Sequence, residues 1–311
     1  MQSNPPIYRV RYLSLGQWLA DQLATAIAQL DGKTHSGLVI ALPPFSCSTR
    51  QFGTLASPLL LQLASQRQTT PSLLGTQLIS QLTVQACSPF KPTFSLQAEG
   101  WLYAHFCDLA LAQWLQTLWC QPPLVFTGRS PKLEAEAVEI RPGVSTDPLL
   151  FQLQYAHARC WSLLRLAAQE YNLEQPTKQG TPSEYPSGSP WLTKTQLLCL
   201  TTPAEQHLLL QLMQFPGSIA TQKQIYGIPH RHWMNTATCL EQPLDLKRLR
   251  RSSQTWSEAV LAFYRDCRMF GDLYRHSPDL VRSRITLVSI VQQVLQVILN
   301  QFWHIEAPTT L

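Results

Sequence analysis

The chain has 311 residues, of which 45% are hydrophobic and only 14% are charged, and its formal net charge is +5. This apolar content excludes an intrinsically disordered chain, and the length is enough for roughly two domains. Arg supplies most of the positive charge, with seventeen Arg against seven Lys. Because Arg suits forked recognition of phosphates, the composition is compatible with a nucleic-acid partner but does not require one.

The first 120 residues carry a mixture of helix and strand patterns. Apolar stripes and Pro or Gly breaks predict, in chain order, a helix over 14–30, a strand over 38–42, helices over 55–65 and 71–82, two strands within 93–105, and a helix over 106–118. Thr70 and Pro71 have the types that begin a helix well. We therefore predict an α+β domain over residues 1–120.

Residues 121–148 are predicted to form a linker, because Pro and Gly interrupt the pattern there and leave one short strand near 137–140. Beyond the linker, periodic apolar stripes predict helices over 149–171, 202–215, 253–270 and 278–303. Thr202 and Glu205 have the spacing of a capping box. Residues 149–311 are therefore expected to form an all-α bundle, so that the fold class of the chain is mostly α.

Neither a metal site nor a cofactor is expected. The eight Cys include no pair two or three residues apart, so the usual zinc and redox spacings are absent and we expect buried, reduced thiols. The N-terminal residues lack a basic region followed by an apolar stretch, which predicts no signal peptide. Gln292, Gln293 and Gln296 interrupt the apolar segment 285–299, so we predict no membrane span there and a cytoplasmic location.

Four segments of the second half share their order and spacing with a known family. Gln-Tyr-Ala-His-Ala-Arg occupies 154–159, Leu-Thr-Thr-Pro-Ala-Glu occupies 200–205, Ala-Phe-Tyr-Arg-Asp-Cys-Arg occupies 262–268, and Ile-Glu-Ala-Pro occupies 305–308. Together these segments resemble the anticodon-binding (DALR-type) domain of arginyl-tRNA synthetases. The resemblance implies an anticodon-binding type of helical bundle.

The first half is similar to the additional N-terminal domain of the same synthetases, over 52–57, 71–74 and 97–103. In that family a class I catalytic domain separates the two parts, whereas here only residues 121–148 do, which are too few for a nucleotide-binding sheet. Neither a His-x-Gly-His motif nor a Lys-Met-Ser-Lys-like loop occurs in the sequence. The resemblance therefore implies a protein without the catalytic core, and we expect it not to be an enzyme.

Tyr155 and Arg159 share a face of the first bundle helix, because they are four residues apart. The resemblance places this helix near the anticodon stem and makes both residues candidates for RNA binding. The alternative is that Tyr155 packs within the bundle. His157, between Ala156 and Ala158, is more simply explained as a packing residue, because Ala permits close approach of helices.

A basic cluster is the strongest phosphate-binding candidate, and it comprises Lys247, Arg248, Arg250 and Arg251, with Arg231 and Trp233 upstream. Clustered Arg beside an aromatic ring supplies the charge neutralisation and the stacking surface that single-stranded RNA loops require. We expect these cations to precede a helix that begins near Ser252, whose N-terminal dipole favours anions. Binding is therefore favoured over the alternative, a solvated charge run that caps the helix.

Arg268 and Arg284 match positions where the family also has Arg, and the resemblance makes both candidates for RNA binding. Arg284 also stands near the start of a predicted helix, where its partner is either an external acid or an internal salt bridge. Where the family has basic residues, this helix has Ser289 and Gln292, and Thr-Thr-Leu follows Pro308. These departures count against specific reading of an anticodon.

Two functions from different classes remain open. The first is a non-catalytic protein that binds tRNA or another structured RNA. The second is a protein–protein interaction module, an assembly factor or complex subunit that kept the DALR fold without RNA binding. Nine Trp and few Lys favour the second, since large aromatic side chains are enriched in interface cores. A continuous positive face would favour RNA, and an exposed apolar patch would favour a protein partner.

Overall fold

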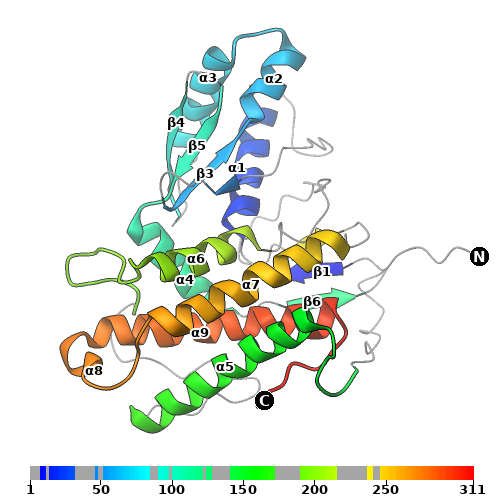
Figure 1. Ribbon diagram of the computed structural model, residues 1–311. Helices are drawn as coiled ribbons and strands as arrows, with labels where there is room; N and C mark the ends of the chain where they lie inside the picture. Colours follow the sequence, from blue (N-terminus) through cyan, green and yellow to red (C-terminus); the bar gives the residue numbers. More distant parts are fainter. Residues whose placement is uncertain are drawn as a thin grey trace, which may run out of the picture.

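The computed structural model describes residues 8–11, 14–31, 46–47, 52–84, 90–97, 100–121, 124–127, 141–171, 190–215, 237–240 and 246–311. Within them, a small unit of helices and strands stands on a layer of long helices (Figure 1). This arrangement confirms the expected fold class, mostly α with a small α+β part. The predicted strands at 38–42 and 137–140 lie outside the described residues.

A four-stranded antiparallel sheet, in the order β2-β3-β5-β4, organises the first half. Its strands are β2 (Ser46–Cys47), β3 (Thr54–Ser57), β4 (Thr93–Leu96) and β5 (Leu102–His105). The accompanying helices are α1 (Leu15–Leu30), α2 (Leu59–Arg67), α3 (Pro71–Val84) and α4 (Asp108–Cys120). The two strands predicted within 93–105 and the helices predicted over 14–30, 71–82 and 106–118 are thereby confirmed to within two residues.

The prediction of a helix over 55–65 is wrong at its start. Residues 54–57 form β3, which pairs with β2 on one edge and with β5 on the other, and α2 begins only at Leu59. Pro58 explains the change, because a proline lacks the N–H that a helix interior requires. Gly53 precedes the strand with φ +74°, a left-handed conformation that glycine adopts without strain, and its carbonyl accepts a hydrogen bond from Phe106 N at 2.9 Å.

The second half is a bundle of four long helices that lie side by side in Figure 1. They are α5 (Pro148–Glu170), α6 (Pro203–Gln214), α7 (Leu246–Asp266) and α9 (Pro278–Val297), with the short α8 (Leu273–His276) before α9 and a π-helical turn, η2 (Ile298–Phe302), after it. α5 packs against α7 and α9, and α6 packs against α7. The predicted capping box at the start of α6 is confirmed, since the side chains of Thr202 and Glu205 each accept the other's backbone N–H.

Two features of this half differ from the sequence predictions. Helix α7 begins at Leu246 and not near Ser252, so the basic cluster lies within its first two turns. The half is also not entirely helical, because it contributes β7 (Ala237–Leu240). This strand pairs antiparallel with β1 (Tyr8–Arg11), whose other edge pairs with β6 (Leu124–Thr127). The sheet β6-β1-β7 therefore joins strands from three distant parts of the chain.

Helix α4 connects the two halves. It packs against α9, and the carboxylate of Asp108 accepts a hydrogen bond from Leu198 N at 2.9 Å. The indole Nε1 of the fully buried Trp191 donates to Gln116 Oε1 at 3.1 Å. The division into 1–120, 121–148 and 149–311 stays a prediction, and these contacts make α4 part of the core on both sides of the proposed boundary.

One described helix, Pro278–Phe302, is long and apolar enough to cross a membrane, but 78% of its most apolar 18-residue stretch is buried inside the protein. It packs as the central helix of the bundle, where α5, α4 and α8 contact it.

The cysteines of the described residues are not all buried. Cys160, Cys199 and Cys267 are buried thiols, as expected, whereas Cys107 and Cys120 at the two ends of α4 are exposed. Within the same part of the chain, no three His, Cys, Asp or Glu side chains gather as a metal site.

Candidate nucleic-acid interface

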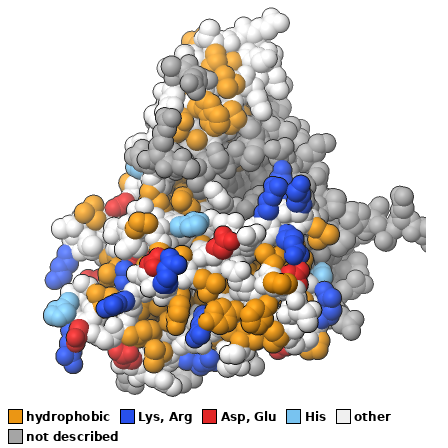
Figure 2. Space-filling model, viewed as in Figure 1, with side chains coloured by type: hydrophobic (Ala, Val, Ile, Leu, Met, Phe, Trp, Pro, Cys, Tyr) orange, Lys and Arg blue, Asp and Glu red, His pale blue; other side chains and the backbone are white. Residues whose placement is uncertain are grey.

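Helices α5 and α7 run side by side in the same direction. Asp147, just before α5, contacts Arg250 near the start of α7, and Arg159, midway along α5, lies near the ring of Tyr264 towards the end of α7. We call the surface that they share the α5–α7 face, which comprises Phe151, Tyr155, Arg159, Arg250 and Tyr264. In Figure 2, Lys and Arg side chains gather where α7 begins, and apolar side chains cover the lower middle of the bundle.

An aromatic–arginine group occupies the middle of the α5–α7 face. Arg159 Nε donates to Tyr155 OH at 2.8 Å, a hydrogen bond that raises the pKa of Arg159. The guanidinium carbon lies 4.9 Å from the ring centre of Tyr155 and 5.5 Å from that of Tyr264. Phe151 stacks on Tyr155 with 6.5 Å between ring centres, and Phe151 and Tyr264 are 45% and 43% exposed. An Arg held against exposed rings can stack on an unpaired base and donate to a phosphate.

The basic cluster lies in the first two turns of α7. Lys247, Arg250 and Arg251 are exposed, Arg248 is half-buried, and Leu249 between them is fully buried in the core. The expectation that these cations precede the helix is wrong, because they lie inside its first two turns. The N-terminal end of a helix carries partial positive charge, so cations there are unfavourable unless an anion neutralises them. Asp147 supplies such an anion to Arg250 at 2.9 Å, and the assignment of the cluster as a phosphate-binding site stays a prediction.

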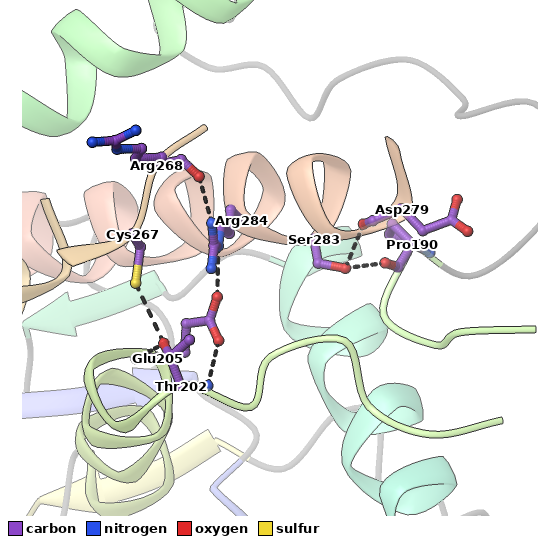
Figure 3. A network of polar contacts seen from close by, with 8 residues as sticks. All are labelled: Pro190, Thr202, Glu205, Cys267, Arg268, Asp279, Ser283 and Arg284. Atoms are coloured by element: carbon purple, nitrogen blue, oxygen red, sulfur yellow. Dashed lines mark hydrogen bonds and ion pairs between the residues drawn. The ribbon is translucent and has the colours of Figure 1, made fainter. Parts of the chain in front are cut away.

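Arg284 is not available for RNA, and its assignment to the RNA-binding set is corrected. Its side chain is 7% exposed and its Nε lies 2.6 Å from Oε1 of Glu205, which is fully buried (Figure 3). Its Nη1 donates to the backbone carbonyl of Arg268. A guanidinium inside a protein requires a paired carboxylate, and Glu205 supplies one from the capping box of α6. The internal salt bridge, one of the two alternatives considered for Arg284, is the one observed.

The remaining candidates lie apart from the α5–α7 face or outside the described chain. Arg268 follows α7 and its side chain is exposed, so it stays a candidate at the far end of the bundle. Arg231 and Trp233 lie outside the described residues, and their assignment stays a prediction.

Ser289 and Gln292 prove to be interior residues. Both are 5% exposed on α9, and Gln292 Nε2 lies 2.9 Å from Nε2 of His157 on α5. His157 Nδ1 lies 2.7 Å from the carbonyl oxygen of Pro308, so it carries the proton and Nε2 accepts from the amide. Because these positions face the core, the absence of basic residues there takes no cation from the α5–α7 face.

The buried His157 predicts a pH-dependent stability. Burial lowers its pKa to about 4, below its usual 6.5, and the side chain is 1% exposed. Because the unfolded chain binds this proton more readily, stability is fully present above about pH 6.5 and is lost as the pH falls towards 4. We expect the free energy of unfolding to drop by roughly 2 kcal/mol between pH 7 and pH 5. Urea denaturation checks this, and a His157→Gln variant that showed the same drop would contradict it.

Tyr264, Phe151 and Asp147 join this site although none was singled out as a site residue. Tyr264 lies inside the 262–268 segment, but no local pattern indicates that its ring meets Arg159 on another helix. Asp147 could have been found, because an Asp directly before Pro is a common helix N-cap, and its carboxylate does accept from Leu149 N.

The helical bundle is the part of the chain that matches a known family. Residues 153–310 match the DALR anticodon binding domain, and the chain belongs to this family. Its curated relatives include an arginine–tRNA ligase of Pelodictyon phaeoclathratiforme, 29% identical over 159 residues, which are 51% of this chain and 22% of the ligase. An arginine–tRNA ligase of Moorella thermoacetica is 28% identical over 50% of this chain and 21% of the ligase. An arginine–tRNA ligase of a Synechococcus species is also 28% identical, over 53% of this chain and 22% of the ligase. The chain thus spans about a fifth of the length of these relatives. No solved structure matches it.

Proposed function

We propose that this chain is a non-catalytic protein that binds tRNA or another structured RNA through the α5–α7 face. The observation that carries the proposal is the aromatic–arginine group of Tyr155, Arg159 and Tyr264 beside the basic cluster of α7. Arg250 and Tyr264 are fourteen residues apart on the same side of α7, about 21 Å at 1.5 Å per residue. Phosphates at the cluster and an unstacked base at the rings can therefore belong to one RNA loop.

Family membership supports an RNA partner. The matched domain is described as anticodon-binding, and the relatives are arginine–tRNA ligases. Their alignment covers only about half of this chain, and the predicted division leaves only residues 121–148 between its two halves. We therefore propose that the chain has no aminoacylation activity. We also propose that it uses no cofactor and acts in the cytoplasm. Arginine-dependent exchange of pyrophosphate into ATP would overturn the non-catalytic part.

The test is a titration of the purified chain with unfractionated tRNA at 50 to 200 mM salt. We expect saturable binding whose affinity falls steeply with salt, because phosphate contacts release counterions. Absence of binding even at the lowest salt concentration would contradict the proposal. In that case the protein–protein interaction module would take its place, with the exposed rings of Phe151 and Tyr264 as the first surface to examine.

A further inference from the structure

Asp147 holds Arg250 in a two-point ion pair at the edge of the basic cluster. Arg250 Nη1 donates to Asp147 Oδ2 at 2.9 Å, and Nη2 donates to Oδ1 at 3.3 Å. The same Oδ1 accepts from Leu149 N at 2.9 Å, which makes Asp147 the N-cap of α5. Ser145 Oγ fixes the backbone of Asp147 by accepting from its N–H at 3.2 Å.

This pairing has the geometry that Arg offers to a phosphate. A guanidinium presents two parallel N–H groups, and either a carboxylate or a phosphate can accept both. The carboxylate of Asp147 therefore occupies the position at Arg250 that a phosphate of RNA would take. The Arg250 side chain is 54% exposed and that of Asp147 is 30% exposed, so the pair is open to solvent. An exposed pair of this kind is weak, and an incoming phosphate can displace it.

Asp147 cannot move far away when it is displaced, because its N-cap hydrogen bond ties it to the first turn of α5. Its negative charge would then remain a few ångströms from the entering phosphate and repel it. Lys247 and Arg251, one turn apart on the exposed side of α7, attract RNA to the same place. A phosphate at Arg250 is therefore repelled by Asp147 and attracted by Lys247 and Arg251.

We propose that Asp147 competes with RNA phosphate for Arg250 and thereby limits the affinity of the α5–α7 face. This inference rests on the proposed RNA-binding function and names a residue that regulates the same site. A single phosphate gains little by displacing Asp147. An RNA that also contacts the other cations and the ring of Tyr155 gains enough to do so, and Asp147 therefore selects for extended ligands over isolated phosphates.

The test uses Asp147→Ser, because Ser is as good an N-cap as Asp but carries no charge. We expect this variant to bind unfractionated tRNA roughly threefold to fivefold more tightly than the wild-type chain at 50 mM salt, the range of an exposed ion pair. In an Arg250→Gln background the same change should give a smaller gain, because only the repulsion by the Asp147 charge is then removed. The matched control is Asp31→Ser, which removes an aspartate paired with Arg67 at 2.6 Å in the first half. It should leave tRNA affinity unchanged.

Each outcome decides between the two claims. Salt-sensitive tRNA binding by the wild-type chain together with equal or weaker binding by Asp147→Ser would overturn this inference while the proposed function stands. Weaker binding by Asp147→Ser than by the wild-type chain would mean that Asp147 orients Arg250 for RNA. A gain of the same size in the Arg250→Gln background would also overturn it, because competition for Arg250 requires Arg250. If neither the wild-type chain nor Asp147→Ser binds tRNA at 50 mM salt, the proposed function fails and this inference fails with it.

Discussion

Replacing Arg284 with Met is expected to lower the free energy of unfolding by about 3 to 5 kcal/mol, because it leaves the carboxylate of Glu205 charged, buried and unpaired. Glu205 is fully buried and its Oε1 lies 2.6 Å from Arg284 Nε. Its Oε2 accepts from Thr202 N at 2.7 Å, a capping hydrogen bond that the substitution leaves in place. Denaturation in urea, followed by Trp fluorescence and circular dichroism, measures the effect.

The matched control is the double variant Arg284→Met with Glu205→Gln. Gln keeps the capping hydrogen bond to Thr202 N but carries no charge, so the double variant should be more stable than Arg284→Met alone. This non-additivity separates the ion pair from simple loss of packing. If the two substitutions destabilised the protein additively, the network drawn in Figure 3 would not couple α6 to α9.

Changing Lys247, Arg248, Arg250 and Arg251 together to Gln is expected to weaken tRNA binding roughly a hundredfold at 50 mM salt. An exposed charge contact contributes about 0.7 kcal/mol, and four such contacts correspond to about two powers of ten. The helix should remain intact, because removing cations from its first turns relieves repulsion with the helix dipole. Fluorescence anisotropy with labelled tRNA gives the affinity, and circular dichroism gives the helix content.

The control for this variant is Arg67→Gln with Lys91→Gln, two cations of the first half. Arg67 pairs with Asp31 and Lys91 is exposed, and neither lies on the bundle. A loss of affinity in this control as large as in the α7 variant would assign the binding to overall charge and not to the α5–α7 face.

Local signals predicted the elements of the bundle well. The spacing of Thr202 and Glu205 gave the start of α6, and the apolar stripe of residues 149–171 gave α5 to within one residue at each end. Tyr155 and Arg159 were placed on one helical face and are joined there by a hydrogen bond. These features depend on contacts within a few residues, which a sequence pattern records directly.

Features that depend on distant partners could not be predicted in the same way. The strand at 54–57 exists because β2 and β5 pair with it, and this pairing overrides its helix-like apolar pattern. The sequence leaves the partner of Arg284 open between an external acid and an internal salt bridge, because Glu205 lies seventy-nine residues earlier and only the fold places it beside Arg284. Tyr264 meets Arg159 only because α5 and α7 run in parallel at matching heights. Periodicity gives the face of a helix but not the register between two helices.

The most direct test of RNA binding by the α5–α7 face compares the salt dependence of tRNA binding in the wild-type chain with that in the fourfold Gln variant of α7. Each phosphate contact to single-stranded RNA contributes roughly 0.7 to the slope of log affinity against log salt. We expect the wild-type slope to be steeper by roughly 3, so that the wild-type affinity falls about fiftyfold more between 50 and 200 mM salt. Equal slopes in the two proteins would contradict it.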